Sequence, residues 1–204
     1  ETMPGAAALC AAAAVESGAG LTTVNTLRSV IPIVAGHVPE ATFYYRDDNL
    51  NGFLEGKDAV AAGPGLGRLS DDIIEDLITN FNGPLVIDAD GLYKLGSHED
   101  LIRKRTAPLI ITPHAGEMAR IINKDIEYVN SNRYETAAKL AADYGIYVVL
   151  KGPETIVAEP EGGLWINHTG NSGLAKGGTG DVLTGMMLAF IAQGTDIQPA
   201  VSNA

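Results

Sequence analysis

The sequence has one cysteine and few basic residues, and each shortage excludes a class of protein. Cys10 alone rules out an intrachain disulfide and a cysteine-rich metal site, so we expect a cytoplasmic protein. The chain has 14 Lys and Arg against 25 Asp and Glu, a formal net charge of −11. Nucleic acids and anionic membranes need clustered basic side chains, so we expect neither as a partner. No apolar run approaches the roughly 20 residues that span a bilayer.

What the chain does have is the composition of a globular domain with a real core. It has 204 residues, of which 46% are hydrophobic and 24 are glycine. It opens inside a helix start, "MPGAAAL", and closes on "DIQPAVSNA", a helix barely begun. We therefore expect a single domain over residues 1–204, truncated at both ends.

Short apolar segments alternate with helical ones along the chain. The expected strands are 21–26, 41–45, 59–63, 84–89, 108–112, 146–152, 154–159 and 163–167, and the expected helices are 5–17, 70–80, 114–123, 127–144, 179–193 and 196 onward. Several strands are almost continuous in Val, Ile and Leu, as in parallel strands buried on both faces. The pattern predicts an α/β domain with a mainly parallel sheet between helical layers and a β-hairpin at one edge.

The segments that follow the strands have the composition of a binding-site rim. They read "PGLG" (64–67), "DADGL" (88–92), "PHAGE" (113–117) and "KGPET" (151–155), and the last strand leads into a glycine-rich loop. In such sheets ligands bind beyond the carboxyl ends of the strands. We expect these segments to surround one ligand groove.

The glycine-rich loop, "TGNSGLAKGGTGDVLTGMMLAF" (169–190), runs directly into an apolar helix. A helix that starts after glycines presents unpaired N–H groups to an anion, so Gly177, Gly178 and Gly180 could line a phosphate site. Asp181 would then lie in the first turn, facing the reacting end of the anion. The alternative is a structural loop with Asp181 as the helix N-cap. The loop is not a Walker A motif, because no "GK[ST]" closes it.

These motifs together resemble those of the ADP- or ATP-dependent NAD(P)H-hydrate dehydratases of the ribokinase-like superfamily. "PGAAALCAAAAVESGAGLTTV", "AAGPGLG", "VIDADGL", "ITPHAGE", "VVLKGPETIV" and the glycine loop occur in the family order. Ala115 replaces a proline that the family usually has, and the family's first strand and last helices lie outside this sequence. The resemblance implies a three-layer α/β/α sandwich and the dehydration of hydrated NADH or NADPH, driven by ATP or ADP with Mg²⁺.

The resemblance also implies roles for single residues. It makes Asp181 the general base on the substrate hydroxyl and assigns Glu117 to magnesium through water. Contacts to the hydrated dinucleotide fall to Ala6, Gly65, His114 and Asp181. The nucleotide would bind at Lys151, Gly152, Pro153, Glu154, Thr155, Gly177, Gly178, Thr179 and Gly180.

Each assignment has a structural alternative. His114 could cap a helix, Glu117 could be an ordinary first-turn glutamate, Gly65 could serve a tight turn, and "KGPET" could be a plain hairpin entry. Among the other histidines we expect His37 and His98 at the surface. His168 adjoins the glycine loop and is a weaker candidate for a ligand contact than His114. We expect Asp88 and Asp90 to shape a strand end and cap the next helix.

Two other functions share these motifs. A small-molecule kinase such as hydroxyethylthiazole kinase shares "GTGD" and the same mode of phosphate binding. A catalytically silent nucleotide-binding module would also retain the loop. Intact "KGGTG" and Asp181 argue against silence, and "TPHAGE" with "KGPET" favours the dehydratase. The expected partners are the hydrated dinucleotide and an adenine nucleotide, and we expect a homo-oligomer.

Overall fold

The structure is a computed structural model and describes residues 3–46, 49–67 and 71–204. Its main sheet has six strands in chain order: β3 (Val60–Ala62), β4 (Leu85–Ile87), β5 (Leu109–Ile111), β6 (Tyr147–Leu150), β7 (Thr155–Ala158) and β8 (Leu164–Asn167). Strands β3 to β6 are parallel, and β7 and β8 pair antiparallel at one edge. The predicted parallel sheet and edge hairpin are confirmed.

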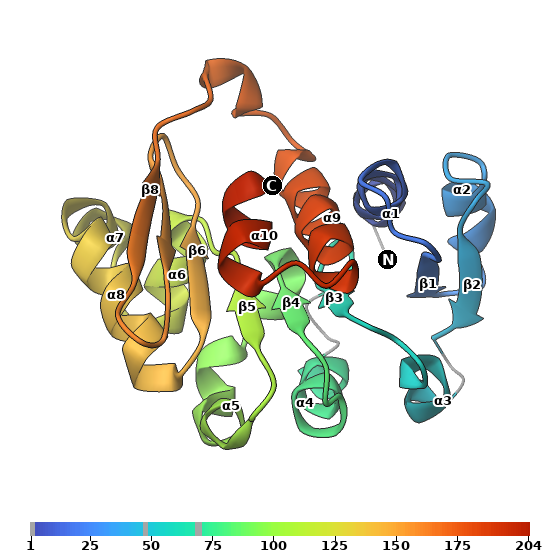
Figure 1. The fold of residues 1–204 in the computed structure, drawn as a ribbon, viewed down its shortest axis with the longest axis horizontal. Coiled ribbons are helices and arrows are strands. Elements are labelled where there is room, and N and C mark those ends of the chain that lie inside the picture. The colour runs from blue at the N-terminus through green and yellow to red at the C-terminus, as the bar shows by residue number, and fades with distance from the viewer. Residues whose placement is uncertain (1–2, 47–48, 68–70) are drawn as a thin grey trace.

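Helices cover both faces of this sheet (Figure 1). One face packs against α4 (Asp71–Asn80), α5 (Glu99–Lys104), α6 (Ala115–Ile121), α7 (Ile126–Ser131) and α8 (Arg133–Tyr144); the other packs against α9 (Thr179–Ala192) and α10 (Ile197–Asn203). Strand β4 shows why. Side chains alternate across a strand, so Leu85 and Ile87 join the first core and Val86 joins the second. The predicted three layers are confirmed.

The strands β1 (Thr23–Thr26) and β2 (Thr42–Tyr45) form a separate two-stranded parallel sheet. Helix α2 (Ile31–Ala35) connects them, and α3 (Leu50–Leu54) precedes β3. In Figure 1 this small sheet lies beyond α1 (Pro4–Glu16), on the side away from the main sheet. The sequence predicts both strands but not their division into a second sheet.

The helix predicted over 127–144 is two helices, so this prediction is wrong in its continuity. The break is at Asn132, whose backbone angles of −131° and 38° are not helical. The Asn132 side chain donates to the carbonyl oxygen of Tyr128 at 2.9 Å, and Thr136 donates to the Asn132 carbonyl at 2.6 Å. An asparagine that bonds nearby backbone competes with the helix in this way.

Short elements escaped prediction because their sequences carry too few residues to show a period. They are α2, α3, α5 and the 3-10 turns Ala89–Leu92, Leu95–His98 and Ser172–Leu174. The prediction that His98 lies at the surface is wrong, since only 8% of it is exposed. Buried Leu95 and Ile102 on either side draw this turn into the core. No helix in the described part of the chain is long and apolar enough to cross a membrane.

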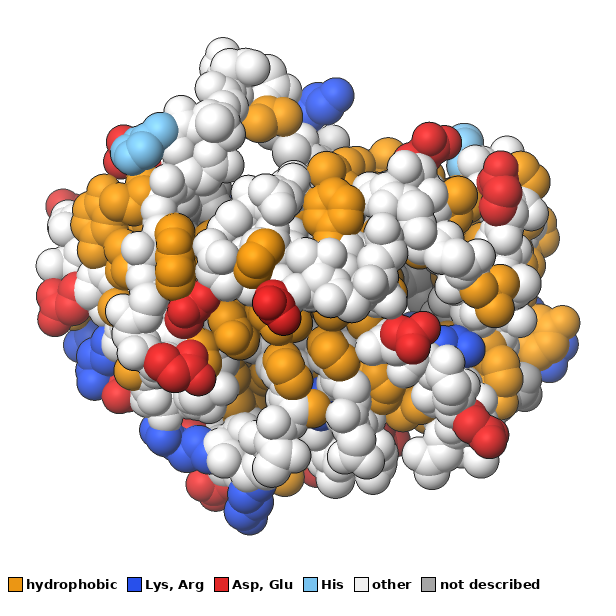
Figure 2. Space-filling model, in the orientation of Figure 1, with side chains coloured by type: hydrophobic (Ala, Val, Ile, Leu, Met, Phe, Trp, Pro, Cys, Tyr) orange, Lys and Arg blue, Asp and Glu red, His pale blue; other side chains and the backbone are white. Residues whose placement is uncertain are grey.

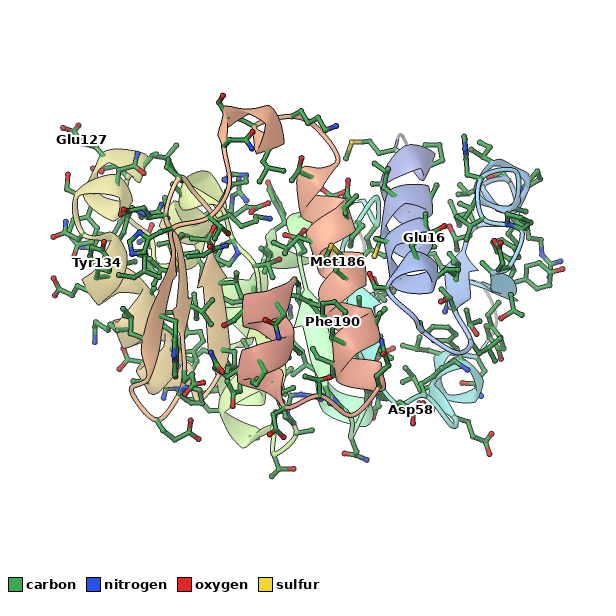
Figure 3. The ribbon with its side chains drawn as sticks, turned by 45° about the horizontal axis from the view of Figure 1, so that its top comes forward. Glu16, Asp58, Glu127, Tyr134, Met186 and Phe190 are labelled. Atoms are coloured by element: carbon green, nitrogen blue, oxygen red, sulfur yellow. The ribbon has the colours of Figure 1, made fainter. Side chains whose placement is uncertain are left out.

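Helices α1 and α9 lie side by side in close contact (Figures 1 and 3). Gly185 faces the backbone of α1 so closely that a Cβ there would overlap the carbonyl oxygen of Cys10 and lie 2.8 Å from the Cβ of Ala13. The alanines of α1 and this glycine let the two backbones approach. This contact fixes α9, and with it the glycine loop, against the start of the chain.

We expect Gly185→Ala to lower the free energy of unfolding by about 1–3 kcal/mol, because overpacking at a rigid backbone contact forces the helices apart. The matched control is Gly5→Ala on α1, where a Cβ would meet nothing within 4 Å. Urea unfolding of both variants checks this. Equal stability of the two would contradict the close approach.

Candidate functional site

The amino end of α9 is uncapped and has open space in front of it. Gly178 is its N-cap at φ 93°, a left-handed conformation that favours glycine, and no side chain among the described residues caps this end. A Cβ at Gly177 would meet nothing within 4 Å. The hydroxyl of Thr179 is buried without a hydrogen-bond partner. A phosphate group would fit the open space and would accept hydrogen bonds from the unpaired N–H groups and the Thr179 hydroxyl.

Asp181 lies in the first turn of α9, three residues after the N-cap, so the alternative that it is the cap is wrong. The residue is half-buried. Burial raises the pKa of its carboxyl above the usual value, and the negative charge of Asp88 adds to this, while Lys151 opposes it. A carboxylate with a raised pKa is a better proton acceptor.

Asp88 and Lys151 form an ion pair beside this turn. Lys151 Nζ lies 2.6 Å from Asp88 Oδ1, and Asp88 is only 1% exposed. Thr184 of α9 donates to Asp88 Oδ2 at 3.0 Å. The prediction that Asp88 caps a helix is wrong, because its side chain makes no capping bond to the turn that follows. Asp88 belongs to the site, and sequence analysis missed this.

Residues 151–154 form the turn between β6 and β7, which begins at Thr155, and Arg133 at the start of α8 holds this turn. Its guanidinium donates to the carbonyl oxygens of Leu150 and Glu154, both at 3.1 Å, and to that of Lys151 at 3.4 Å. A Cβ at Gly152 would lie 2.6 Å from Arg133 Nη2. The segment is therefore the entry to a hairpin, as the structural alternative predicted, and the bonds from Arg133 restrain this turn.

The carboxylate of Glu154 joins this turn to two other elements. His168 Nδ1 lies 3.3 Å from Glu154 Oε1, and Tyr134 of α8, labelled in Figure 3, donates to Glu154 Oε2 at 3.4 Å. His168 therefore lies beside the predicted nucleotide segment. The chain then passes through the exposed loop at the top of Figure 1 to reach α9.

His114 caps α6, so its capping alternative is correct. Its Nδ1 accepts from the N–H groups of Gly116 at 3.0 Å and Glu117 at 3.3 Å, and Glu117 Oε2 accepts from the N–H of His114 at 2.8 Å. The imidazole is 59% exposed and can still meet a ligand.

Glu117 is mostly buried, and burial raises the pKa of its carboxyl. Lys151 Nζ is 4.0 Å from Glu117 Oε2, which brings Glu117 into the cluster around Lys151.

Gly65 lies against the start of α1. Its φ is 66°, and a Cβ would lie 2.5 Å from the carbonyl oxygen of Met3 and 3.5 Å from the Cβ of Ala6. Asp90 Oδ2 accepts from Gly67 N–H at 3.0 Å, so its carboxylate supports this loop, a contact that the sequence did not predict. A small pocket lies beside it, lined by Met3, Pro4, Ala7, Asn25, Thr26, Leu27, Val30, Arg46, Pro64, Gly65 and Leu66. The structure thus brings Gly65 and Ala6 together, and Gly65 also serves a tight turn.

The net negative charge does not exclude an anionic ligand from this site. Asp and Glu side chains are scattered over the face in Figure 2 and form no single patch there. At α9 the carboxylates of Asp88 and Glu117 lie around the ammonium of Lys151, next to the helix N–H groups. These side chains sum to a negative charge, so it is the unpaired N–H groups of the helix start, together with the Lys151 ammonium, that could hold an anion here.

Comparison with known proteins identifies the family of this chain. The family model for NAD(P)H-hydrate dehydratase matches residues 1–204. The chain belongs to the NAD(P)H-hydrate dehydratase family. It is 38% identical to the ADP-dependent (S)-NAD(P)H-hydrate dehydratase of Bacillus subtilis, over 100% of this chain and 74% of that protein. It is 36% identical to the bifunctional NAD(P)H-hydrate repair enzyme of Thermofilum pendens, over 97% of this chain but only 40% of that relative.

A solved structure of this family has the same fold. The Bacillus subtilis ADP/ATP-dependent NAD(P)H-hydrate dehydratase, co-crystallised with ATP and Mg²⁺ and soaked with CoA, superposes with a TM-score of 0.86 at 36% identity, covering 100% of this chain and 75% of that one. A hydroxyethylthiazole kinase from Pyrococcus horikoshii has a TM-score of 0.59 at 17% identity, covering 95% and 80%. That likeness shows a shared fold alone, so the kinase alternative has no further support.

Arg133 gives a testable property of the family's "KGPET" segment. We expect Arg133→Met to lower the free energy of unfolding by about 2 kcal/mol or more, because three carbonyl groups lose a charged donor. Lys139→Met on the same helix is the control. Its ammonium is 70% exposed and pairs with Asp143, and an exposed surface pair of this kind contributes little to stability. Urea unfolding measures the free energy of unfolding of both variants. Equal losses would contradict the conclusion that Arg133 holds the turn after β6.

Proposed function

We propose that this chain catalyses the dehydration of hydrated NADH or NADPH to NADH or NADPH, with ATP or ADP as the phosphoryl donor. The observation that carries the proposal is the position of Asp181 in the first turn of α9, directly after the glycine loop, where Lys151 is near enough to lower the pKa of its carboxyl. A base, a phosphate-binding helix end and a cation meet there. The cytoplasmic location expected from the single cysteine is part of the same proposal.

The chemistry follows from the poor leaving ability of a ring hydroxyl. Asp181 accepts the hydroxyl proton as the oxygen attacks the terminal phosphorus, and the bond to the bridging oxygen of the nucleotide breaks, releasing ADP or AMP. The lone pair of the ring nitrogen then expels phosphate, and loss of the neighbouring ring proton forms the double bond. The products are NADH or NADPH, phosphate and the shortened nucleotide. Helix N–H groups and Lys151 stabilise the charge on the transferred group.

The residues fit a nucleotide with magnesium. The unpaired Thr179 hydroxyl and the uncapped N–H groups of α9 would donate hydrogen bonds to phosphate oxygens. Residues 151–155, restrained by Arg133, would contact the rest of the nucleotide. No three His, Cys, Asp or Glu among the described residues form a metal-binding group. Mg²⁺ typically uses one or two carboxylates together with phosphates and water, so Glu117 would hold it through water. Mg²⁺ would neutralise charge on the phosphates.

The hydrated dinucleotide would lie on the other side of the transferred phosphoryl group. Ala6 and Gly65 would form one wall of this site, since a Cβ at Gly65 would lie 3.5 Å from the Cβ of Ala6. The exposed imidazole of His114 would provide a further contact. Replacing Gly65 would not test substrate binding cleanly, because any side chain there collides with the Met3 carbonyl.

The proposal is tested by incubating the protein with hydrated NADH or hydrated NADPH, with and without ATP or ADP, and following the absorbance of the regenerated coenzyme. We expect recovery of the coenzyme only when a nucleotide is present, with one phosphate released for each molecule recovered. Phosphorylation of a thiazole alcohol in place of this reaction would support the kinase alternative.

We expect Asp181→Asn to lower turnover by at least about 10²–10⁴-fold, the usual contribution of general-base catalysis, while both ligands still bind. Asn has the size of Asp but cannot accept the hydroxyl proton. Turnover and calorimetric nucleotide affinity are measured on the same preparation. Near-normal turnover would remove Asp181 from the chemistry.

The same variant should also be more stable than the wild type near neutral pH. The pKa of Asp181 is raised on folding, so its ionised form is less favourable in the folded state than in the unfolded state. This penalty is fully present above the folded pKa and disappears below the unfolded pKa. Thermal unfolding of Asp181→Asn and wild type at neutral and acidic pH checks it; a gain that persists in acid would point to another cause.

A further inference from the structure

The ion pair of Asp88 and Lys151 uses both oxygens of a buried carboxylate. Oδ1 lies 2.6 Å from Lys151 Nζ at the end of β6, and Oδ2 accepts from Thr184 Oγ1 on α9 at 3.0 Å. Asp88 is 1% exposed and Thr184 is fully buried. A carboxylate engaged in this way does not meet the substrate. It connects the Lys151 ammonium to the helix that carries Asp181.

The ammonium is held where a helix by itself would repel it. A Cβ on Gly180, in the first turn of α9, would be 3.3 Å from Lys151 Nζ and 3.5 Å from Asp88 Oδ2. The amino end of a helix carries partial positive charge, so a lysine there needs a nearby anion. Asp88 is the nearest anion, and Glu117 Oε2 is 4.0 Å away. The backbone N–H of Lys151 donates to the Pro113 carbonyl at 2.9 Å, which fixes the base of the side chain.

We infer that Asp88 is a positioning residue, which holds the Lys151 ammonium and the first turn of α9 at a fixed separation so that both meet the transferred phosphoryl group. The inference rests on the proposed function. The Lys151 side chain is 21% exposed, which leaves part of the ammonium for a phosphate oxygen. Charge that is placed before the reaction stabilises a transition state without reorganising during it.

The first test is a double-mutant cycle on turnover with Asp88→Asn, Lys151→Met and the double variant. Each single change should lower kcat roughly 10²-fold, the usual loss for one preorganised donor, with the KM for the dinucleotide unchanged. The double variant should match Lys151→Met within about twofold, because Asp88 acts through Lys151. Independent, multiplying losses would overturn the inference, and so would a raised Mg²⁺ requirement in Asp88→Asn, since that would place Asp88 with the metal.

A milder variant keeps the test open if Asp88→Asn folds poorly. Thr184→Val removes the hydrogen bond to Asp88 Oδ2 with little change of shape. We expect kcat to fall several-fold and expect no further fall when Lys151→Met is already present. The control is Thr136→Val on α8, which also removes one buried hydroxyl bond, to the Asn132 carbonyl at 2.6 Å. Equal effects of the two changes on kcat would overturn the inference.

A structural test does not depend on the dehydration reaction. Crystals of wild type and Asp88→Asn with a non-hydrolysable ATP analogue should show Lys151 Nζ between Asp88 and the terminal phosphate in the wild type, and displaced from α9 in the variant. An unmoved Lys151 in the variant would overturn the inference. If the wild type regenerates no NADH or NADPH, the proposed function fails, while this test still decides the role of Asp88.

Discussion

The buried ion pair between Asp88 and Lys151 is the interaction on which the site depends. Asp88 follows β4 and Lys151 follows β6, so the pair crosses the end of β5, which lies between them in the sheet. Thr184 adds α9 to the same carboxylate. Removing one partner of a buried pair leaves an uncompensated charge and typically costs about 3–5 kcal/mol. One carboxylate therefore links the ends of two strands of the same sheet to α9.

Close backbone contacts complete this frame. Gly185 allows α9 to pack directly on α1, and Gly180 leaves room for the ion pair at the first turn. Asp181 lies between these two glycines, so its position is set by packing on one side and by charge on the other. Its raised pKa has the same origin, because burial and the neighbouring Asp88 both disfavour the ionised form. The geometry that places Asp181 also increases the affinity of its carboxylate for a proton.

The sequence predicts the parts of this site that lie in short motifs. The glycine loop, Asp181, "KGPET" and "PHAGE" are recognisable because each motif is continuous and ends a predicted strand. The strong Val, Ile and Leu runs likewise predict the buried strands, since their period needs only a few residues. The roles of these residues toward ligands remain proposals.

The rest depends on contacts that no local pattern shows. Asp88 and Lys151 are 63 positions apart, and nothing in "VIDADGL" marks the first aspartate as buried and paired with a lysine. Arg133 follows Asn132 in what reads as one continuous amphipathic helix, where an arginine is expected to face solvent. Its contacts to the carbonyls of Leu150, Lys151 and Glu154 arise only when α8 packs against the sheet. The separation of β1 and β2 from the main sheet also follows from tertiary packing.

The central claim is that the ring hydroxyl is phosphorylated before it leaves. The most direct test uses hydrated NADH whose ring hydroxyl carries a heavy isotope of oxygen, together with ATP or ADP and the protein, followed by mass analysis of the released phosphate. The account predicts that the heavy oxygen appears in phosphate, because the bond broken in the second step joins the ring carbon to that oxygen. Heavy oxygen found in water, with unlabelled phosphate, would contradict it.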